Sequence, residues 1–112
     1  MYLLAIHTDW EEKAREEVLE FLGQQNPTTE SISRLKMVGM IINETLRLYP
    51  PFVLLQREVT KNTRLGKLKI PAGIEVIIAT LAVHHSSEVW GEGAHLFKPE
   101  DLMKGSLEQQ GM

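Results

Sequence analysis

The stretch Asn-Glu-Thr-Leu-Arg-Leu-Tyr-Pro-Pro, residues 43–51 of a 112-residue chain, places two opposite charges inside an apolar segment. Residues 35–49 are predicted to form a helix that the two prolines end, because proline cannot continue the helical hydrogen bonds. Apolar residues leave this helix almost no polar arc, which predicts burial nearly all round. Glu44 and Arg47 lie three residues apart and therefore share a face. Since unpaired buried charges are costly, we expect them to pair with each other and with a more distant group.

Upstream of this helix, residues 8–23 are predicted to form a charged amphipathic helix. Thr8 and Glu11 have the spacing of a capping box at its start. Apolar residues recur at helical spacing from Trp10 onward, and Gly23 supplies a C-terminal stop. The acidic residues fall mostly off the apolar stripe, so we interpret them as a solvated face.

Downstream of the prolines, residues 52–79 change to short apolar and β-branched runs separated by turns at residues 61–63 and 71–73. A small antiparallel meander of three strands is the simplest interpretation. Residues 80–100 are predicted to form a loop with a short helical piece, and residues 101–112 a polar tail. The predicted fold class is α+β: two helices, then a small antiparallel β-meander and an irregular tail.

The composition excludes several classes of protein. The chain is 43% hydrophobic and 24% charged, has a net charge of -3 and contains no cysteine. Disulfides, zinc–thiolate sites and a thiolate ligand to iron are therefore excluded within these residues. The mild, dispersed negative charge argues against a nucleic-acid partner. The longest run that is apolar apart from one threonine, Val76 to Val83, is far shorter than the ~20 residues of a membrane span. No signal peptide is visible either. Both observations predict a soluble or cytoplasmic chain as given.

Neither a catalytic nor a metal site is predicted from the residues. His84 and His85 are adjacent, but neighbours in a strand or turn point apart, and no third ligand accompanies them at a suitable spacing. The chain has no nucleophile-elbow glycine pattern, no P-loop and no dinucleotide-binding motif.

The order of these features resembles the middle-to-late part of a cytochrome P-450, the heme-thiolate monooxygenase family. The stretch 43–51 carries most of the resemblance. It is followed in order by Ile70-Pro71-Ala72-Gly73, by His84-His85 with Trp90-Gly91, and by Phe97-Lys98-Pro99-Glu100. The sequences of residues 14–18 and 82–85 are similar to those of the plant group that includes secologanin synthase. The resemblance covers about residues 1–100, so we expect a partial chain of the mainly helical cytochrome P-450 fold.

The resemblance implies a role for the two charges in residues 43–51. In the family, the glutamate and arginine of the E-x-x-R motif form a three-way ion pair with an arginine of a downstream F-x-P-E-R-F segment. Glu44 and Arg47 match the first two partners. Asp101 and Leu102 stand where the family has the arginine and the final aromatic residue. A carboxylate there attracts Arg47 but repels Glu44, so we expect the network to be broken or rearranged.

Two further roles are implied by the resemblance. Arg57 matches an arginine that in many members contacts a heme propionate, and a guanidinium suits that carboxylate. The alternative for Arg57 is an exposed strand arginine. The run Phe52, Val53, Leu54 and Leu55 corresponds to a stretch that borders the substrate pocket. The alternative for this run is plain hydrophobic core, which the residues alone favour.

At family level, the resemblance implies a heme-dependent monooxygenase at the endoplasmic reticulum membrane. It would oxidise a small lipophilic substrate, such as a plant secondary metabolite or a hormone-like molecule, with O2 and electrons from an NADPH-dependent reductase. The residues include neither the oxygen-handling helix nor the heme-ligand cysteine, so we expect an inactive fragment that binds no heme. One alternative is a non-catalytic interaction module derived from the same family, and another is an unrelated domain with coincidental motifs. Because few elements can cover the apolar helix, we also expect the chain to self-associate.

Overall fold

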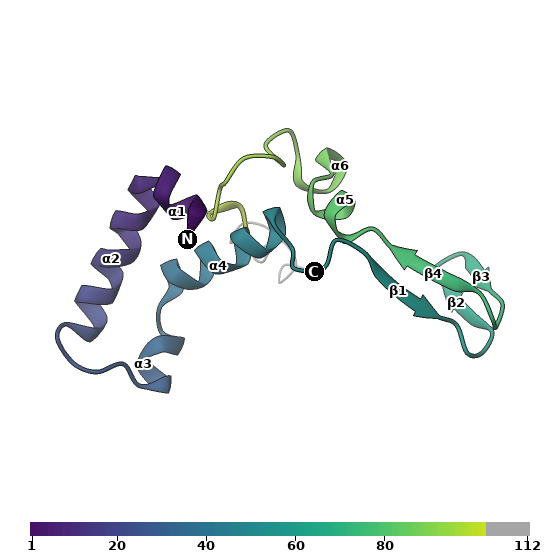
Figure 1. The fold of residues 1–112 in the computed structure, drawn as a ribbon, viewed down its shortest axis with the longest axis horizontal. Helices are drawn as coiled ribbons and strands as arrows, with labels where there is room; N and C mark the ends of the chain where they lie inside the picture. Colours follow the sequence, from purple (N-terminus) through teal and green to yellow (C-terminus); the bar gives the residue numbers. More distant parts are fainter. Residues whose placement is uncertain (103–112) are drawn as a thin grey trace. The chain divides into compact units, whose positions relative to one another are not determined.

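The computed structural model describes residues 1–102, which fall into two units (Figure 1). The first unit comprises Met1–Leu48 together with the described residues from Leu96 onward, and the second comprises Tyr49–His95. The chain has the predicted fold class, with helices first and a small antiparallel strand region after them. Most of the predicted tail, residues 103–112, lies outside the described residues.

The first unit is built from helices α1 (Tyr2–Ile6), α2 (Thr8–Leu22), α3 (Thr29–Ser33) and α4 (Lys36–Leu48). Both α1 and α4 pack against α2. The buried core of the unit brings together the side chains of Leu3, Trp10, Ile41, Leu48 and Phe97. Residues that precede α4 in the chain (Leu3 and Trp10) and one that follows it (Phe97) thus cover one side of this helix.

Helix α2 occupies the predicted range and ends at Gly23, whose φ of 55° is a conformation that favours glycine. Its start differs from the prediction, because Thr8 is already helical and makes no side-chain cap. Only His7 separates α1 from α2, and its carbonyl accepts hydrogen bonds from the amides of Trp10 and Glu11. A capping box is present instead at α3, between Thr28 and the residue three positions on.

Helix α4 is less buried than its composition predicts. One face buries Ile41, Glu44, Arg47 and Leu48, while the other leaves Ile42 52% exposed. Burial nearly all round is therefore wrong for the described residues. The physical reason is that packing partners within the first unit reach α4 from one side only.

The second unit contains β1 (Leu55–Glu58), β2 (Thr63–Leu65), β3 (Leu68–Ile70), β4 (Glu75–Ile78), α5 (Thr80–His84) and α6 (Ser87–Trp90). Strand β1 pairs with β4 and strand β2 pairs with β3, both antiparallel. The strands are therefore nested, which corrects the simple meander of three successive strands. The reason is a tight turn at Gly66, with φ of 60°, which returns the chain as a hairpin between β1 and β4.

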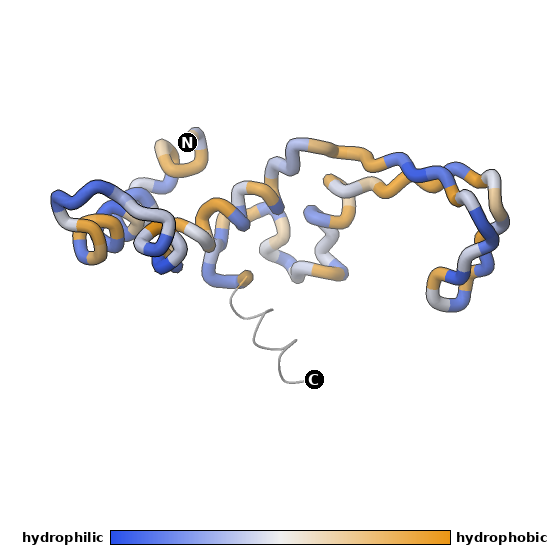
Figure 2. The backbone as a smooth tube through the Cα atoms, turned by 90° about the horizontal axis from the view of Figure 1, so that it is seen from below, coloured by the Kyte–Doolittle hydropathy of each residue, from blue (hydrophilic) through white to orange (hydrophobic). Residues whose placement is uncertain are grey.

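The region 80–100 also holds more structure than predicted, because two short helices replace the single helical piece. Apolar residues run through both units (Figure 2). In the second unit many of them remain exposed, including Phe52, Leu65, Leu68 and Ile77.

Candidate functional site

Glu44 and Arg47 form a buried ion pair on α4. Nε of Arg47 donates to Oε2 of Glu44 at 2.9 Å, and Nη2 of Arg47 donates to Oε1 at 2.6 Å. The exposed fraction is 1% for Glu44 and 6% for Arg47. Two parallel hydrogen bonds between a guanidinium and a carboxylate are the strong form of this interaction. Their spacing of three residues on one helix brings the two groups together.

The ion pair also binds a more distant segment, through backbone groups of residues 96–98. Nη2 of Arg47 donates to the carbonyl oxygen of Leu96 at 3.1 Å, and the amide of Lys98 donates to Oε1 of Glu44 at 3.1 Å. The pair therefore offers a donor to a backbone acceptor and an acceptor to a backbone donor. The residues alone predicted a more distant partner of unstated kind, and the resemblance implied an arginine side chain. The backbone groups carry no sequence signal, because every residue except proline has both an N–H and a carbonyl.

Phe97 places this backbone beside the ion pair. Its side chain is 7% exposed and packs into the core of the first unit. The ring lies 4.8 Å from the ring of His7 and 6.4 Å from that of Trp10, centroid to centroid. Burial of this one aromatic residue holds the peptide groups on either side of it against Glu44 and Arg47.

Asp101 lies a short way beyond this segment. Its amide donates to the carbonyl oxygen of Lys98 at 3.1 Å, and Asp101 is half-buried. The rearrangement of the family's three-way network around Asp101 stays a prediction.

A second carboxylate holds the other end of α4. Oε1 of Glu17 accepts a hydrogen bond from the amide of Met37 at 2.9 Å, and Oε2 accepts one from Val38 at 3.0 Å. The first amides of a helix lack partners within it, and the positive end of the helix dipole favours an anion. The interpretation of Glu17 as part of a solvated face is therefore wrong. No local pattern could have shown its role, because packing of α2 on α4 brings these groups together.

The remaining predicted site residues lie in the second unit. Arg57 is exposed on β1, opposite Val76 in the register. Phe52 is 69% exposed, and Val53 and Leu54 are also exposed, whereas Leu55 is half-buried at the start of β1. Plain hydrophobic core is therefore the wrong interpretation of this run for the described residues. The assignments of Arg57 to a heme propionate and of residues 52–55 to a pocket border stay predictions.

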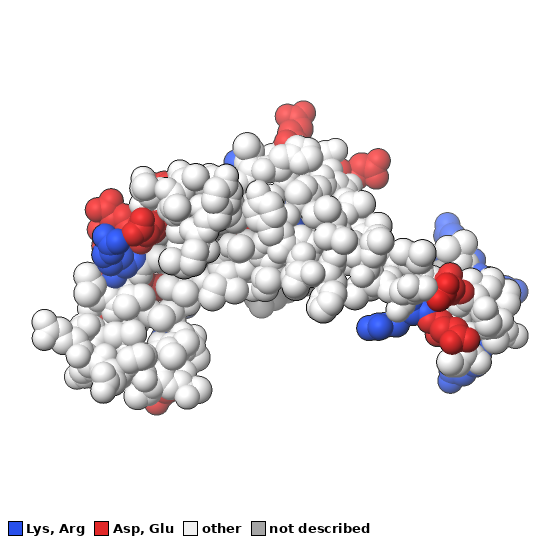
Figure 3. All heavy atoms as spheres, in the orientation of Figure 1, with Lys and Arg blue, Asp and Glu red and all other residues white. Residues whose placement is uncertain are grey.

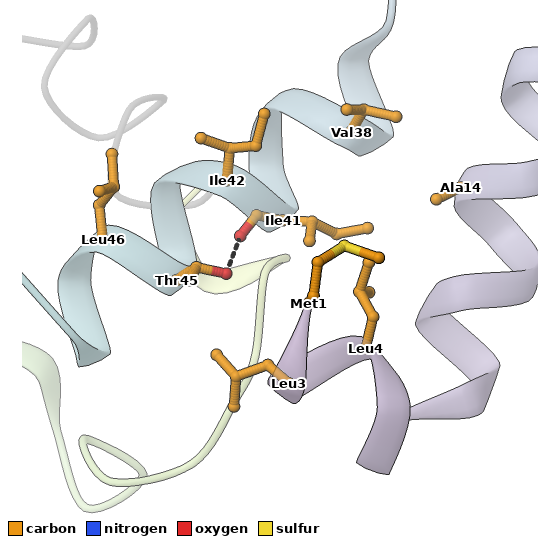
Figure 4. A pocket seen from close by; sticks show the side chains of 9 residues that line it. All are labelled: Met1, Leu3, Leu4, Ala14, Val38, Ile41, Ile42, Thr45 and Leu46. Atoms are coloured by element: carbon orange, nitrogen blue, oxygen red, sulfur yellow. Dashed lines mark hydrogen bonds between the residues drawn. The ribbon is translucent and has the colours of Figure 1, made fainter.

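An apolar cavity of about 370 Å³ lies in the first unit, between Met1, α1, α2 and α4 (Figure 4). Its lining consists of Met1, Leu3, Leu4, Ala14, Val38, Ile41, Ile42, Thr45 and Leu46. The hydroxyl of Thr45 donates to the carbonyl oxygen of Ile41 at 2.7 Å, so its one proton is used and only its oxygen can still accept a hydrogen bond. The side chains of the cavity thus provide mostly apolar surface, with the hydroxyl oxygen of Thr45 as their one polar atom able to accept from a ligand.

Comparison with known proteins decides the family. The cytochrome P450 family model matches residues 1–104. The chain belongs to the cytochrome P450 family. It is 52% identical over 105 residues to "Cytochrome P450 CYP749A22" of Panax ginseng, covering 94% of this chain and 20% of that protein. It is 46% identical to "11-oxo-beta-amyrin 30-oxidase" of Glycyrrhiza uralensis, with the same coverage. It is 45% identical over 103 residues to "Secologanin synthase 1" of Catharanthus roseus, covering 92% of this chain and 20% of that protein.

This cytochrome P450 chain thus spans about a fifth of the length of the curated relatives it matches. Proteins of the family carry heme, generally receive electrons from a reductase and act on lipophilic substrates. Plant members are typically membrane-bound. Within residues 1–102, no helix combines the length and the apolar character needed to cross a bilayer.

The residues of this chain do not by themselves fit a heme. The 112 residues include no cysteine, so they offer no thiolate to the iron. The one cation that the resemblance assigns to the heme, Arg57, lies on an exposed strand. Among the described residues, no group of three or more His, Cys, Asp or Glu side chains could hold a metal ion. The rings of His85 and His95 lie edge to face, with their centroids 5.8 Å apart and their planes at 72°.

Proposed function

We propose that these residues supply the E-x-x-R region of a plant cytochrome P450 monooxygenase and that their role is structural. The observation that carries the proposal is the buried Glu44–Arg47 pair with its two hydrogen bonds to the main chain of residues 96–98. This arrangement joins two segments that lie about fifty residues apart in the chain. In the proposed role, the pair fixes the F-K-P-E segment, from which the chain continues toward the heme region in the family.

When these residues are joined to the rest of a cytochrome P450, the reaction we propose for the whole protein is oxidation of a small lipophilic plant secondary metabolite. It uses heme, O2 and electrons from an NADPH-dependent reductase, at the endoplasmic reticulum membrane. The names of two relatives, an oxidase and a synthase from plants, support this class of reaction. In that context, Arg57 is proposed to contact a heme propionate, and residues 52–55 to border the substrate pocket.

The 112 residues alone are proposed to be inactive as a monooxygenase, because they cannot supply a thiolate ligand. The chain is expressed, supplied with heme and examined by its carbon monoxide difference spectrum. No band of thiolate-ligated heme is expected. A band at that position would contradict the proposed inactivity.

A chimera tests the structural role. The fifth of the ginseng relative that matches this chain, at 52% identity over 105 residues, is replaced with the matching residues of this chain. The chimera is expected to show the thiolate band, and the same chimera with Arg47→Ala is expected to lose most of it. Arg34→Ala is the matched control, because Arg34 pairs with Glu30 on the exposed surface of α3. Equal spectra for the Arg47→Ala and Arg34→Ala chimeras would refute the structural role.

A non-catalytic interaction module is the second candidate, favoured by the exposed apolar face of α4. Ile42 is 52% exposed and Leu46 is 47% exposed on a helix whose opposite face is buried. The proposed contact is with a full-length cytochrome P450. Co-purification with the ginseng relative is expected for the natural chain and not for Ile42→Ser/Leu46→Ser. Equal recovery of both forms would remove this candidate.

A further inference from the structure

The cavity of about 370 Å³ in the first unit has the size of a small-molecule site, since such sites measure about 300–1,000 Å³. Its lining residues come from Met1, α1, α2 and α4, so the cavity is formed entirely within one unit. Figure 4 shows the side chains of Met1 and Leu4 pointing toward Ile41 of α4. Residues 52–55, which are proposed to border the substrate pocket, are not among its lining residues.

The walls of the cavity disfavour charged ligands. None of the described side chains that line it carries a charge, and all except that of Thr45 are aliphatic or a thioether. Figure 3 shows the same contrast over the first unit, where charged side chains gather over α2 and the surface over α4 is mostly uncharged. Moving an ion from water into such surroundings is costly when no partner neutralises it. The ligand that these walls favour is therefore neutral and lipophilic.

Thr45 gives the cavity one polar preference. Its hydroxyl donates its single proton to the carbonyl oxygen of Ile41, a bond between residues four apart that threonine can make within a helix. The oxygen keeps a lone pair that can accept a hydrogen bond. Thr45 is half-buried, so a ligand that covers this oxygen without donating to it removes the oxygen from water without compensation. A hydroxyl group on the ligand can donate to it, whereas a ketone or an ether cannot.

We propose that the cavity between Met1, α1, α2 and α4 binds a small lipophilic molecule with one hydroxyl group, an alcohol or a phenol. The hydrocarbon part contacts Leu4, Ala14 and Ile41, and the hydroxyl group donates to Oγ1 of Thr45. An alcohol therefore binds better than the ether or ketone of the same skeleton. The proposal concerns a different set of residues from the ion pair and does not depend on the heme chemistry of the family.

A second copy of the chain is the competing occupant. Ile42 and Leu46 line the cavity and are 52% and 47% exposed, so association through α4 would cover the site. These aliphatic side chains would bring no donor to the oxygen of Thr45, which favours the small molecule. Binding is therefore measured on the monomer, at protein concentrations where sedimentation velocity shows no association.

Isothermal titration calorimetry of the monomer with 2-naphthol and with 2-methoxynaphthalene tests the polar preference. The two molecules share one ring system, and a phenol keeps its proton at pH 7. The Kd of 2-naphthol is expected to be about fivefold lower, from one hydrogen bond. Thr45→Val keeps the shape of the side chain and removes its oxygen, so this preference is expected to disappear. Thr45→Ser keeps the hydroxyl and is the matched control, which is expected to retain the preference.

Filling the cavity tests the location. Ala14→Leu adds a larger side chain at the lining and is expected to raise the Kd of both molecules about tenfold or more. Ala5→Leu makes the same change at an exposed position of α1 outside the lining, and is expected to change either Kd less than about twofold. Circular dichroism checks that each variant is folded. In the natural chain, 2-naphthol is expected to shift the methyl resonances of Ala14 and Ile41 and not that of Ala5.

Four results would overturn the proposal: no binding to the monomer, equal Kd values for the two molecules in the natural chain, a preference that survives Thr45→Val, or methyl shifts at Ala5 instead of Ala14 and Ile41. Equal effects of Ala14→Leu and Ala5→Leu in folded variants would also contradict it. If the monomer binds neither molecule while the chain still associates, the cavity is an interface between copies and not a small-molecule site.

Discussion

Glu17 holds the N-terminus of α4 from a different helix, and its removal provides a direct test of how that helix is positioned. The carboxylate accepts hydrogen bonds from the amides of Met37 and Val38. A hydrogen bond to a charged group contributes about 1.5–3 kcal/mol, and loss of a helix cap costs about 0.5–2 kcal/mol. Water can replace part of what is lost, because Met37 and Val38 are only half-buried. We therefore expect Glu17→Ala to lower the free energy of unfolding of the first unit by about 2 kcal/mol.

Glu17→Gln separates charge from hydrogen bonding. The amide keeps one acceptor oxygen but loses the second acceptor and the negative charge that the helix dipole favours. An intermediate loss of about 1 kcal/mol is expected. Glu16→Ala is the matched control, because Glu16 is the exposed neighbour on the same helix, and its expected effect is within about 0.5 kcal/mol.

Urea unfolding followed by the fluorescence of Trp10 measures these losses, since Trp10 is buried in the core of the first unit. A Trp90→Phe background removes the signal of the second unit's tryptophan. Hydrogen exchange of the Met37 and Val38 amides provides a local measurement, and Glu17→Ala is expected to accelerate it about tenfold or more. If Glu17→Ala and Glu16→Ala unfold at the same urea concentration and exchange these amides equally, Glu17 does not cap α4.

Three further outcomes follow from the first unit. Arg47→Ala leaves the carboxylate of Glu44 buried without its guanidinium and is expected to lower the free energy of unfolding by about 3–5 kcal/mol, measured in urea. The double variant Glu44→Gln/Arg47→Gln should cost less, because it leaves no unpaired charge. A loss below about 1 kcal/mol in Arg47→Ala would contradict the burial of the pair. Phe97→Ala is expected to cost about 3–5 kcal/mol by the same measurement, because it empties a core position; an effect no larger than that of an exposed substitution would contradict its anchoring role. Sedimentation velocity should show self-association of the natural chain and less of it in Ile42→Ser/Leu46→Ser, and a natural chain that stays monomeric at all concentrations would refute that expectation.

Local signals identified several elements because each depends on close neighbours in the chain. Gly23 adopts the positive φ that ends α2, and α4 ends at Leu48, just before the two prolines. Local patterns do not predict how a helix begins where two helices follow each other directly. A capping box was expected at Thr8, but α1 enters α2 through His7 and removes the need for it.

The sequence by itself determined the α+β class, the cytochrome P450 family and the pairing of Glu44 with Arg47, a pair three residues apart on one helix. Only the tertiary structure decided the nested pairing of β1 with β4, the cap that Glu17 places on α4, and the backbone of residues 96–98 as a partner of the ion pair. The physical reason is separation along the chain. Glu17 and Met37 lie 20 residues apart, and Glu44 and Lys98 lie 54 apart. Periodicity and capping patterns report on neighbours within about a turn, so contacts made by packing leave no local pattern to detect.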